Sequence, residues 1–159
     1  MRAAVYSAAF VLLWAWLAAS VQPLDARLPF GIPAWARLIG WPLVLAGALL
    51  TLWCIITFVA RGRGTPAPFD PPREFVAAGP YRYVRNPMYI GAFGVLLGSG
   101  LILRSPSIVG LAALFLLLVH LLVLLYEEPA LTSQFGDPYR QYKSSVHRWL
   151  PRLPGAPLR

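Results

Sequence analysis

Residues 79–91 read GPYRYVRNPMYIG and place two arginines, three tyrosines and two prolines between segments apolar enough to cross a membrane. A second polar cluster, Glu127, Glu128 and Pro129, stands at the end of the last apolar segment. Charged side chains are costly at a membrane unless they pair with one another or take part in function. We therefore treat these two clusters as the candidate functional elements and expect them to meet in the folded protein.

The composition indicates a small integral membrane protein, because 58% of the 159 residues are hydrophobic and the mean hydropathy is +0.61. A helix needs about 20 residues to cross the hydrocarbon core, with about 17 as the lower limit. The third apolar run is shorter than the others, and its GxxxG pattern (Gly94 and Gly98) favours close helix packing. The apolar runs are Ala3–Val21, Leu38–Val59, Met88–Leu103 and Ile108–Tyr126.

From these runs we predict an all-α membrane protein with about four transmembrane helices. Residues 1–159 are expected to form a single membrane domain, made of a helical hairpin (1–60) and a core (61–153). The first run is long, carries Trp14 and Trp16 and lacks a clean small-residue cleavage site, which predicts a retained helix rather than a signal peptide.

The net charge of +8 is compatible with a nucleic-acid partner, but membrane topology explains it better. With the N-terminus inside, the outer loops hold only Arg27, Arg37 and Arg104, and the inner segments hold the other eleven Lys and Arg residues. This positive-inside pattern predicts cytoplasmic N- and C-termini, a lipid bilayer as partner and no nucleic acid. The lone Cys54 implies no disulfide framework, and two histidines with one cysteine predict no metal site.

The inner loop and the helix that follows it are predicted to form an anion site. Prolines and glycines over residues 61–72 favour turns or extended backbone. Asn86 is a favourable N-cap and Pro87 a favourable first helical residue. The positive end of this third helix would therefore lie beside Arg82 and Arg85.

The tail after Pro129 is predicted to be amphipathic, to lie on the membrane surface and to fold back over the inner loop. Gly136 interrupts it, and Asp137 is the expected N-cap of a second short helix. The apolar stripe of the tail consists of Leu131, Phe135, Tyr139, Tyr142, Val146 and Trp149.

Three kinds of polar residue in these segments have alternative interpretations. Glu127 and Glu128, expected at a helix C-terminus, oppose the macrodipole, so they are either solvated or paired with Arg82, Arg85 or a cationic ligand. His120, seven residues before Glu127, is expected on the same helical face, where it either bonds a carbonyl or acts as a general base. Five tyrosines are either interfacial belt residues or an aromatic cage for a cation: Tyr81, Tyr83, Tyr89, Tyr139 and Tyr142.

Together, the two clusters resemble the signatures of the isoprenylcysteine carboxyl methyltransferase superfamily, which also includes membrane phospholipid methyltransferases. Residues 79–91 are similar to its R-H-P-x-Y-hydrophobic-G motif, and residues 127–151 are similar to its C-terminal signature. The likeness covers residues 61–153 and implies a methyltransferase-like core there, with S-adenosylmethionine as cofactor and methyl donor.

The resemblance also implies roles for particular residues, with the donor held at the cytosolic face under the C-terminal helices. Apart from the resemblance, we predict Glu127 and His120 as catalytic residues, and Arg148 and Trp149 as residues that bind the acceptor, a small lipidic or amphiphilic molecule. The likeness and the aromatic-cage interpretation of the tyrosines together give the predicted cofactor-binding residues: Tyr81, Arg85, Asn86, Pro87, Met88, Tyr89, Gly91, Glu127, Glu128, Tyr139 and Tyr142.

The chain departs from the carboxyl methyltransferase pattern at three positions. Asn86 replaces a histidine, as in phospholipid methyltransferases, and His147 stands where relatives often have proline. Val123 replaces an arginine suited to a substrate carboxylate, which argues against a prenylcysteine substrate.

Two other functions stay open at the level of sequence. A membrane reductase of the sterol-reductase type, dependent on NADPH, shares a related motif, but the acidic pair Glu127 and Glu128 suits the methyl donor better than a diphosphate. A non-enzymatic structural membrane protein is the other alternative. The sequence leaves open the identity of the acceptor, the atom that is methylated and whether the chain forms a homo-oligomer.

Overall fold

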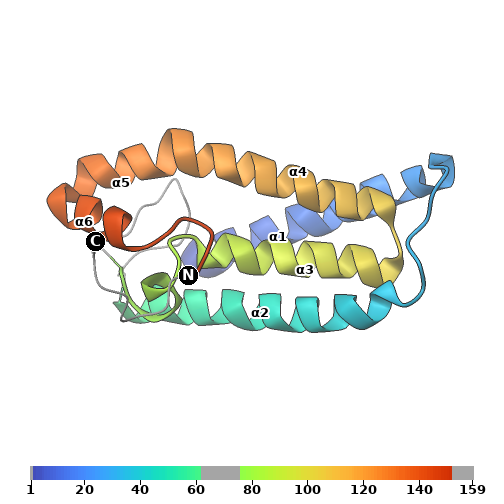
Figure 1. Ribbon diagram of the computed structural model, residues 1–159, viewed down its shortest axis with the longest axis horizontal. Helices are drawn as coiled ribbons and strands as arrows, with labels where there is room; N and C mark the ends of the chain where they lie inside the picture. Colours follow the sequence, from blue (N-terminus) through green and yellow to red (C-terminus); the bar gives the residue numbers. More distant parts are fainter. Residues whose placement is uncertain (1, 62–75, 152–159) are drawn as a thin grey trace.

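A computed structural model describes residues 2–61 and 76–151, and within these ranges the chain is helical with no strand. Four long helices lie side by side and successive helices run in opposite directions (Figure 1). Three of the described helical segments are long and apolar enough to span a membrane, and α3 is a shorter apolar helix. The predicted all-α membrane fold is confirmed. The long helices are α1 (Arg2–Val21), α2 (Ala36–Arg61), α3 (Pro87–Leu103) and α4 (Pro106–Leu122).

Helices α2 and α3 make the most extensive contact between elements, because glycines let their backbones approach closely. A Cβ atom added to Gly47 would lie 2.5 Å from the carbonyl oxygen of Gly91, and one added to Gly98 would lie 2.7 Å from that of Gly40. The close packing predicted from the GxxxG pattern is therefore confirmed at Gly98. At Gly94 the same test gives a nearest contact of 3.4 Å, so that glycine is not required.

Helix α1 packs against α4 on the other side of the bundle. The indole of Trp14 lies edge-on to Phe115, with ring centroids 4.8 Å apart at 84°. Phe115 is almost fully buried in the main apolar cluster, which also includes Val119 and Val123 of the following turns. This cluster determines which face of α4 points into the bundle. His120 lies in the last turn of the same helix.

The connections at the far end of the bundle are tied down by hydrogen bonds. The 3-10 helix η1 (Gln22–Arg27) follows α1, and Asp25 accepts a 2.8 Å bond from the backbone N–H of Ser107 in the first turn of α4. Arg37 donates to the carbonyl of Ile102 over 3.0 Å. These bonds hold the short connection between α1 and α2 against the α3–α4 turn.

The helix that begins at Pro106 does not end at the two glutamates, so the prediction that they lie at a helix C-terminus was wrong. After α4 comes a π-helical turn, η3 (Val123–Glu127), and then α5 (Glu128–Phe135). The N–H of Glu128 donates to the carbonyl of Val123, five residues back. Pro129 has no N–H to donate, and the wide turn before it lets the helix continue past this residue.

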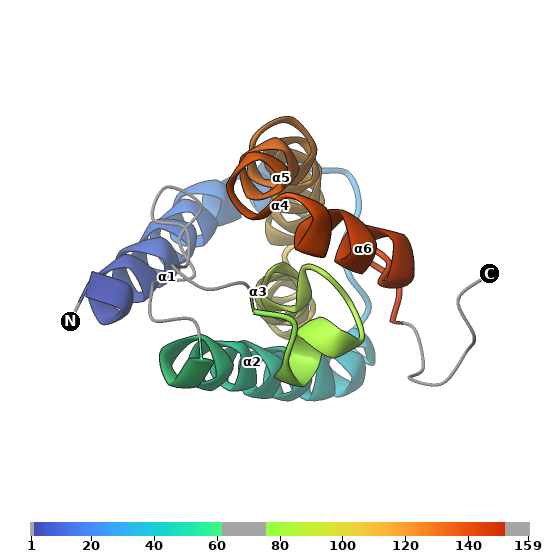
Figure 2. The ribbon, with the colours of Figure 1, turned by 90° about the vertical axis from the view of Figure 1, so that its left-hand side faces the viewer.

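The C-terminal segment folds back over this end of the bundle, as the amphipathic tail predicted. Helix α6 (Asp137–Ser145) turns away from the end of α5 and lies beside the 3-10 helix η2 (Gly79–Arg82) (Figure 2). Its N-cap position is Gly136, with a φ of 59°, so the prediction of Asp137 as N-cap was wrong by one residue. The turn needs a positive φ, which glycine adopts without strain. The prediction for residues 61–72 lies largely outside the described residues.

Candidate functional site

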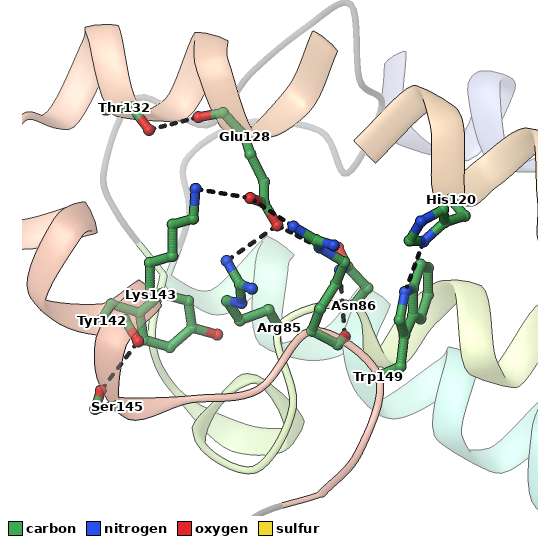
Figure 3. Close-up of polar contacts among 10 residues, drawn as sticks. Arg85, Asn86, His120, Glu128, Thr132, Tyr142, Lys143, Ser145 and Trp149 are labelled. Carbon is green, nitrogen blue, oxygen red and sulfur yellow. Dashed lines mark hydrogen bonds and ion pairs between the residues drawn. The ribbon is translucent and has the colours of Figure 1, made fainter. Parts of the chain in front are cut away.

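The two polar clusters of the sequence meet at Glu128, whose side chain is only 4% exposed (Figure 3). Nη1 of Arg85, just before α3, lies 3.0 Å from Oε1 of Glu128. Arg148 donates to both carboxylate oxygens, from Nε over 2.6 Å and from Nη2 over 3.0 Å. Lys143 of α6 places its Nζ 2.9 Å from Oε2. Among the described residues, one buried carboxylate is therefore shared by three cations.

Of the two arginines predicted as possible partners of the glutamates, Arg85 pairs with Glu128, whereas Arg82 is exposed. The side chain of Arg85 is 9% exposed, and its buried Nε has no hydrogen-bond partner in the described part of the chain. Three cations and one carboxylate leave an excess of positive charge around this point. Such an excess favours a further anionic group, and it is strongest where water is scarce.

Charge and burial also affect the groups around Glu128 that lie outside the membrane-spanning segments. The hydrogen bond to Glu128 raises the pKa of the Arg148 guanidinium above its usual value. Burial raises the pKa of the Tyr139 phenol, and the negative charge of Glu128 adds to this effect. Both groups keep their protons at neutral pH, so Arg148 stays a charged donor to the buried carboxylate and Tyr139 adds no negative charge beside it.

Glu127 has a different partner, although it is the immediate neighbour of Glu128. Its Oε1 accepts a hydrogen bond from the hydroxyl of Tyr89, in the first turn of α3. The π-helical turn η3 ends at Glu127, and π turns in helices are frequent at functional sites. The two glutamates thus link the η3–α5 region to the start of α3 through separate contacts. Glu127 bonds Tyr89 in the first turn of α3, and Glu128 pairs with Arg85 just before it.

A C-terminal strap, defined here as residues 146–151, crosses the start of α3. The N–H of Arg85 donates to the carbonyl of His147 over 2.9 Å, and Nδ2 of Asn86 donates to the carbonyl of Arg148 over 3.3 Å. Asn86 occupies the N-cap position of α3 as predicted, with Pro87 next, but its side chain makes no cap hydrogen bond. It holds the strap instead, and the first N–H groups of α3 have no side-chain cap.

His120 and Trp149, predicted in separate roles, are hydrogen-bonded to each other. Nε1 of Trp149 donates to Nδ1 of His120 over 3.1 Å. No sequence pattern signals this pair, because its members lie 29 residues apart in different elements.

The remaining predicted site residues surround the cluster or pack beneath it. Tyr81 is buried beside Cys54, with Met88 packed against the same group. The carbonyl of Tyr81 accepts a 2.6 Å hydrogen bond from the hydroxyl of Tyr142. Gly91 is buried against Gly47 and Thr51 of α2, which makes it a packing position between helices.

Lys143 is the site residue that sequence reasoning missed. It lies off the apolar stripe of the tail, where a lysine normally indicates a solvated surface, and its side chain is indeed 44% exposed. A surface groove of about 410 Å³ lies beside it, with walls formed by η3, α5 and α6. The groove is lined by Leu124, Glu128, Pro129, Thr132, Ser133, Arg140 and Lys143.

Comparison with known proteins points to one family. A family model described as phospholipid methyltransferase matches residues 35–138. Protein-S-isoprenylcysteine O-methyltransferase of Schizosaccharomyces pombe is 37% identical over 79 residues, which are 50% of this chain and 34% of that protein. The cobalt-zinc-cadmium resistance protein CzcN of Cupriavidus metallidurans is 27% identical over 136 residues, 80% of this chain and 58% of that protein.

A solved structure shares the fold. The eukaryotic intramembrane Ras methyltransferase ICMT (isoprenylcysteine carboxyl methyltransferase) matches with a TM-score of 0.64 and 21% identity, over 87% of this chain and 50% of that one. The chain thus spans about a third to three fifths of the length of these proteins.

Proposed function

The chain belongs to the phospholipid methyltransferase family, and from this premise we propose that it transfers a methyl group from S-adenosylmethionine to a lipidic or amphiphilic acceptor. The observation that carries the proposal is the meeting of both family-like motifs around Glu128 and Glu127. Arg85 of the first motif pairs with Glu128 of the second, and Tyr89 of the first bonds Glu127 of the second. Both contacts lie at the end of the bundle where α3 begins and α6 ends.

The side chains fit the charged groups of such a donor. Its carboxylate would be held by the positive charge that Arg85, Arg148 and Lys143 leave uncompensated around Glu128. The uncapped N–H groups at the start of α3 favour an anion at the same end. Its amino and sulfonium groups suit Glu127, whose partner Tyr89 is neutral and leaves the negative charge of the carboxylate uncompensated within the described residues.

Within this proposal, the two glutamates have different tasks. Glu128 positions the cations and is already neutralised by them, whereas Glu127 would face the bound cation. Tyr142 and Tyr139 pack around the same point from α6 and would help to exclude water. When bound, the donor supplies an electrophilic methyl group, and the protein contributes mainly by alignment, which is worth roughly 7–11 kcal/mol in well-oriented reactions.

The acceptor is proposed to come from the bilayer. Val123, at the position where an arginine would suit a carboxylate substrate, is 1% exposed inside the apolar cluster of α4. It offers no charge to a prenylcysteine carboxylate, so we keep the acceptor class as a lipidic or amphiphilic molecule. By the positive-inside pattern of the sequence, we place the reaction at the cytosolic membrane face.

A labelling experiment tests the proposal. The purified protein is incubated with S-adenosylmethionine labelled on the methyl carbon and with a total lipid extract, and labelled lipids are identified by mass spectrometry. We expect a labelled lipid whose formation falls in the Glu127→Gln variant. The control variant is Asp137→Asn, which changes an exposed carboxylate paired with Arg140 outside the cluster. Equal labelling with heat-denatured protein would contradict the proposal.

A further inference from the structure

The hydrogen bond between Trp149 and His120 has no part in the donor site proposed above. The indole Nε1 lies 3.1 Å from Nδ1 of the imidazole, and the ring centroids are 6.1 Å apart with an angle of 39° between the planes. Figure 3 shows the indole pointing from the strap toward the imidazole at the end of α4. The geometry is that of a directed contact between two polar ring atoms within an apolar environment.

The chemistry of the two rings fixes the direction of this bond. The indole N–H is a donor only, so the nitrogen it meets must be an acceptor. Nδ1 of His120 is therefore unprotonated, and the neutral ring carries its proton on Nε2. With a proton on Nδ1, two N–H groups would face each other and the hydrogen bond could not form.

Contacts of the preceding strap residue hold Trp149 in this position. Arg148 is bound to Glu128 through both guanidinium contacts, and its carbonyl accepts from Asn86. The indole also packs against the buried apolar cluster of α4. The orientation of His120 is thus coupled to the same segment that carries a cation of the Glu128 cluster.

We propose that Trp149 is a positioning residue that keeps His120 neutral with its proton on Nε2, so that His120 donates a hydrogen bond to the methyl acceptor. This inference rests on the proposed function for its kinetic part and replaces the general-base role considered for His120. The basic nitrogen of the ring is already occupied by Trp149. An acceptor molecule suited to this donor carries a carbonyl or phosphate oxygen near the atom that is methylated.

Nitrogen NMR of the full chain tests the assignment without any activity measurement. The protein is labelled with ¹⁵N-histidine and carries His147→Gln, a change at an exposed side chain, so that His120 alone reports. We expect the signals of a neutral ring protonated on Nε2. Trp149→Phe should give a mixture of both tautomers, and the opposite tautomer in the parent protein would overturn the proposal.

A matched control separates the hydrogen bond from the loss of an indole. Trp14→Phe removes an indole that packs on Phe115 in the same apolar cluster. This variant should keep the tautomer of the parent. A mixture in Trp14→Phe as large as that in Trp149→Phe would show that packing, not the bond, selects the tautomer. An unchanged tautomer in Trp149→Phe would also contradict the proposal.

The rate of methyl transfer distinguishes a donor from a base. In His120→Gln the side-chain amide can still donate near the position of Nε2 but cannot accept a proton as a base. A donor role predicts a loss of about 2- to 10-fold in kcat/KM for His120→Leu and a smaller loss for His120→Gln. A base role predicts a loss of about 10²- to 10⁴-fold in both variants, which would overturn the inference. A wild-type protein that transfers no methyl group would contradict the proposed function and not the tautomer, which the NMR experiment decides.

Discussion

Neutralising Glu128 is the change whose consequence the structure defines most sharply. In Glu128→Gln the side chain keeps its size, but the three surrounding cations lose their shared counter-ion. Arg85 suffers most because its side chain is 9% exposed, whereas Lys143 is 44% exposed and can be rehydrated. We therefore expect a large loss of stability that comes mainly from one stranded guanidinium.

The magnitude follows from the burial of the two partners. Removing one partner of a buried pair costs about 3–5 kcal/mol, whereas exposed pairs contribute about 0–1 kcal/mol. Arg148, 22% exposed, lies between these cases, and the amide oxygen of glutamine retains part of the hydrogen bonding. We take about 3 kcal/mol, the lower limit of the buried range. For a chain of this size that corresponds to a fall in Tm of about 6–12 °C.

Thermal unfolding in detergent, followed by tryptophan fluorescence, measures this difference. The matched control is Asp137→Asn, because Asp137 and Arg140 form an ion pair with side chains 90% and 62% exposed. The control should lower the Tm by less than about 4 °C, because an exposed pair contributes at most about 1 kcal/mol. Equal falls in Tm for the two variants would contradict the expectation that the burial of Arg85 determines the loss of stability.

Three further outcomes are expected. Glu127→Gln should weaken S-adenosylmethionine binding in calorimetry at least tenfold while lowering the Tm by only a few degrees, and unchanged affinity would remove Glu127 from the site. Gly98→Ala should destabilise the protein by about 1–3 kcal/mol, because the added carbon meets a backbone oxygen 2.7 Å away. Its control, Gly110→Ala, has nothing within 4 Å of the added carbon and should stabilise α4 by up to about 1 kcal/mol. Denaturant titration measures both free energies of unfolding, and an unchanged value for Gly98→Ala would contradict the close approach of α2 and α3. Reporters fused to each terminus should both be active in the cytoplasm, and opposite locations would contradict the predicted topology.

The positions of the long helices could be predicted from the sequence because apolar runs of membrane-spanning length leave few alternatives. The predicted apolar run Leu38–Val59 corresponds to α2 (Ala36–Arg61), and the run Met88–Leu103 corresponds to α3, which begins at Pro87. The sequence also predicted that an arginine of residues 79–91 could pair with the glutamates, although it did not select Arg85 and Glu128. Two charged clusters at the same end of a small bundle have few other partners.

The continuation of α4 past Glu127 was not predictable from composition. Charges and Pro129 normally indicate a helix end, but a π-helical turn accommodates the proline and the glutamates face protein rather than water. Pairs that join distant elements, such as Trp149 with His120, depend on the path of the strap. Spacing along the chain carries no information about that path.

Direct calorimetry on the wild-type protein in lipid nanodiscs tests whether the junction of the two motifs binds S-adenosylmethionine. Titrations with S-adenosylmethionine, with its demethylated product S-adenosylhomocysteine and with NADPH are compared under one set of conditions. We expect S-adenosylmethionine and S-adenosylhomocysteine each to bind saturably, with one molecule per chain, and we expect NADPH not to bind. Binding of NADPH without binding of S-adenosylmethionine would contradict it.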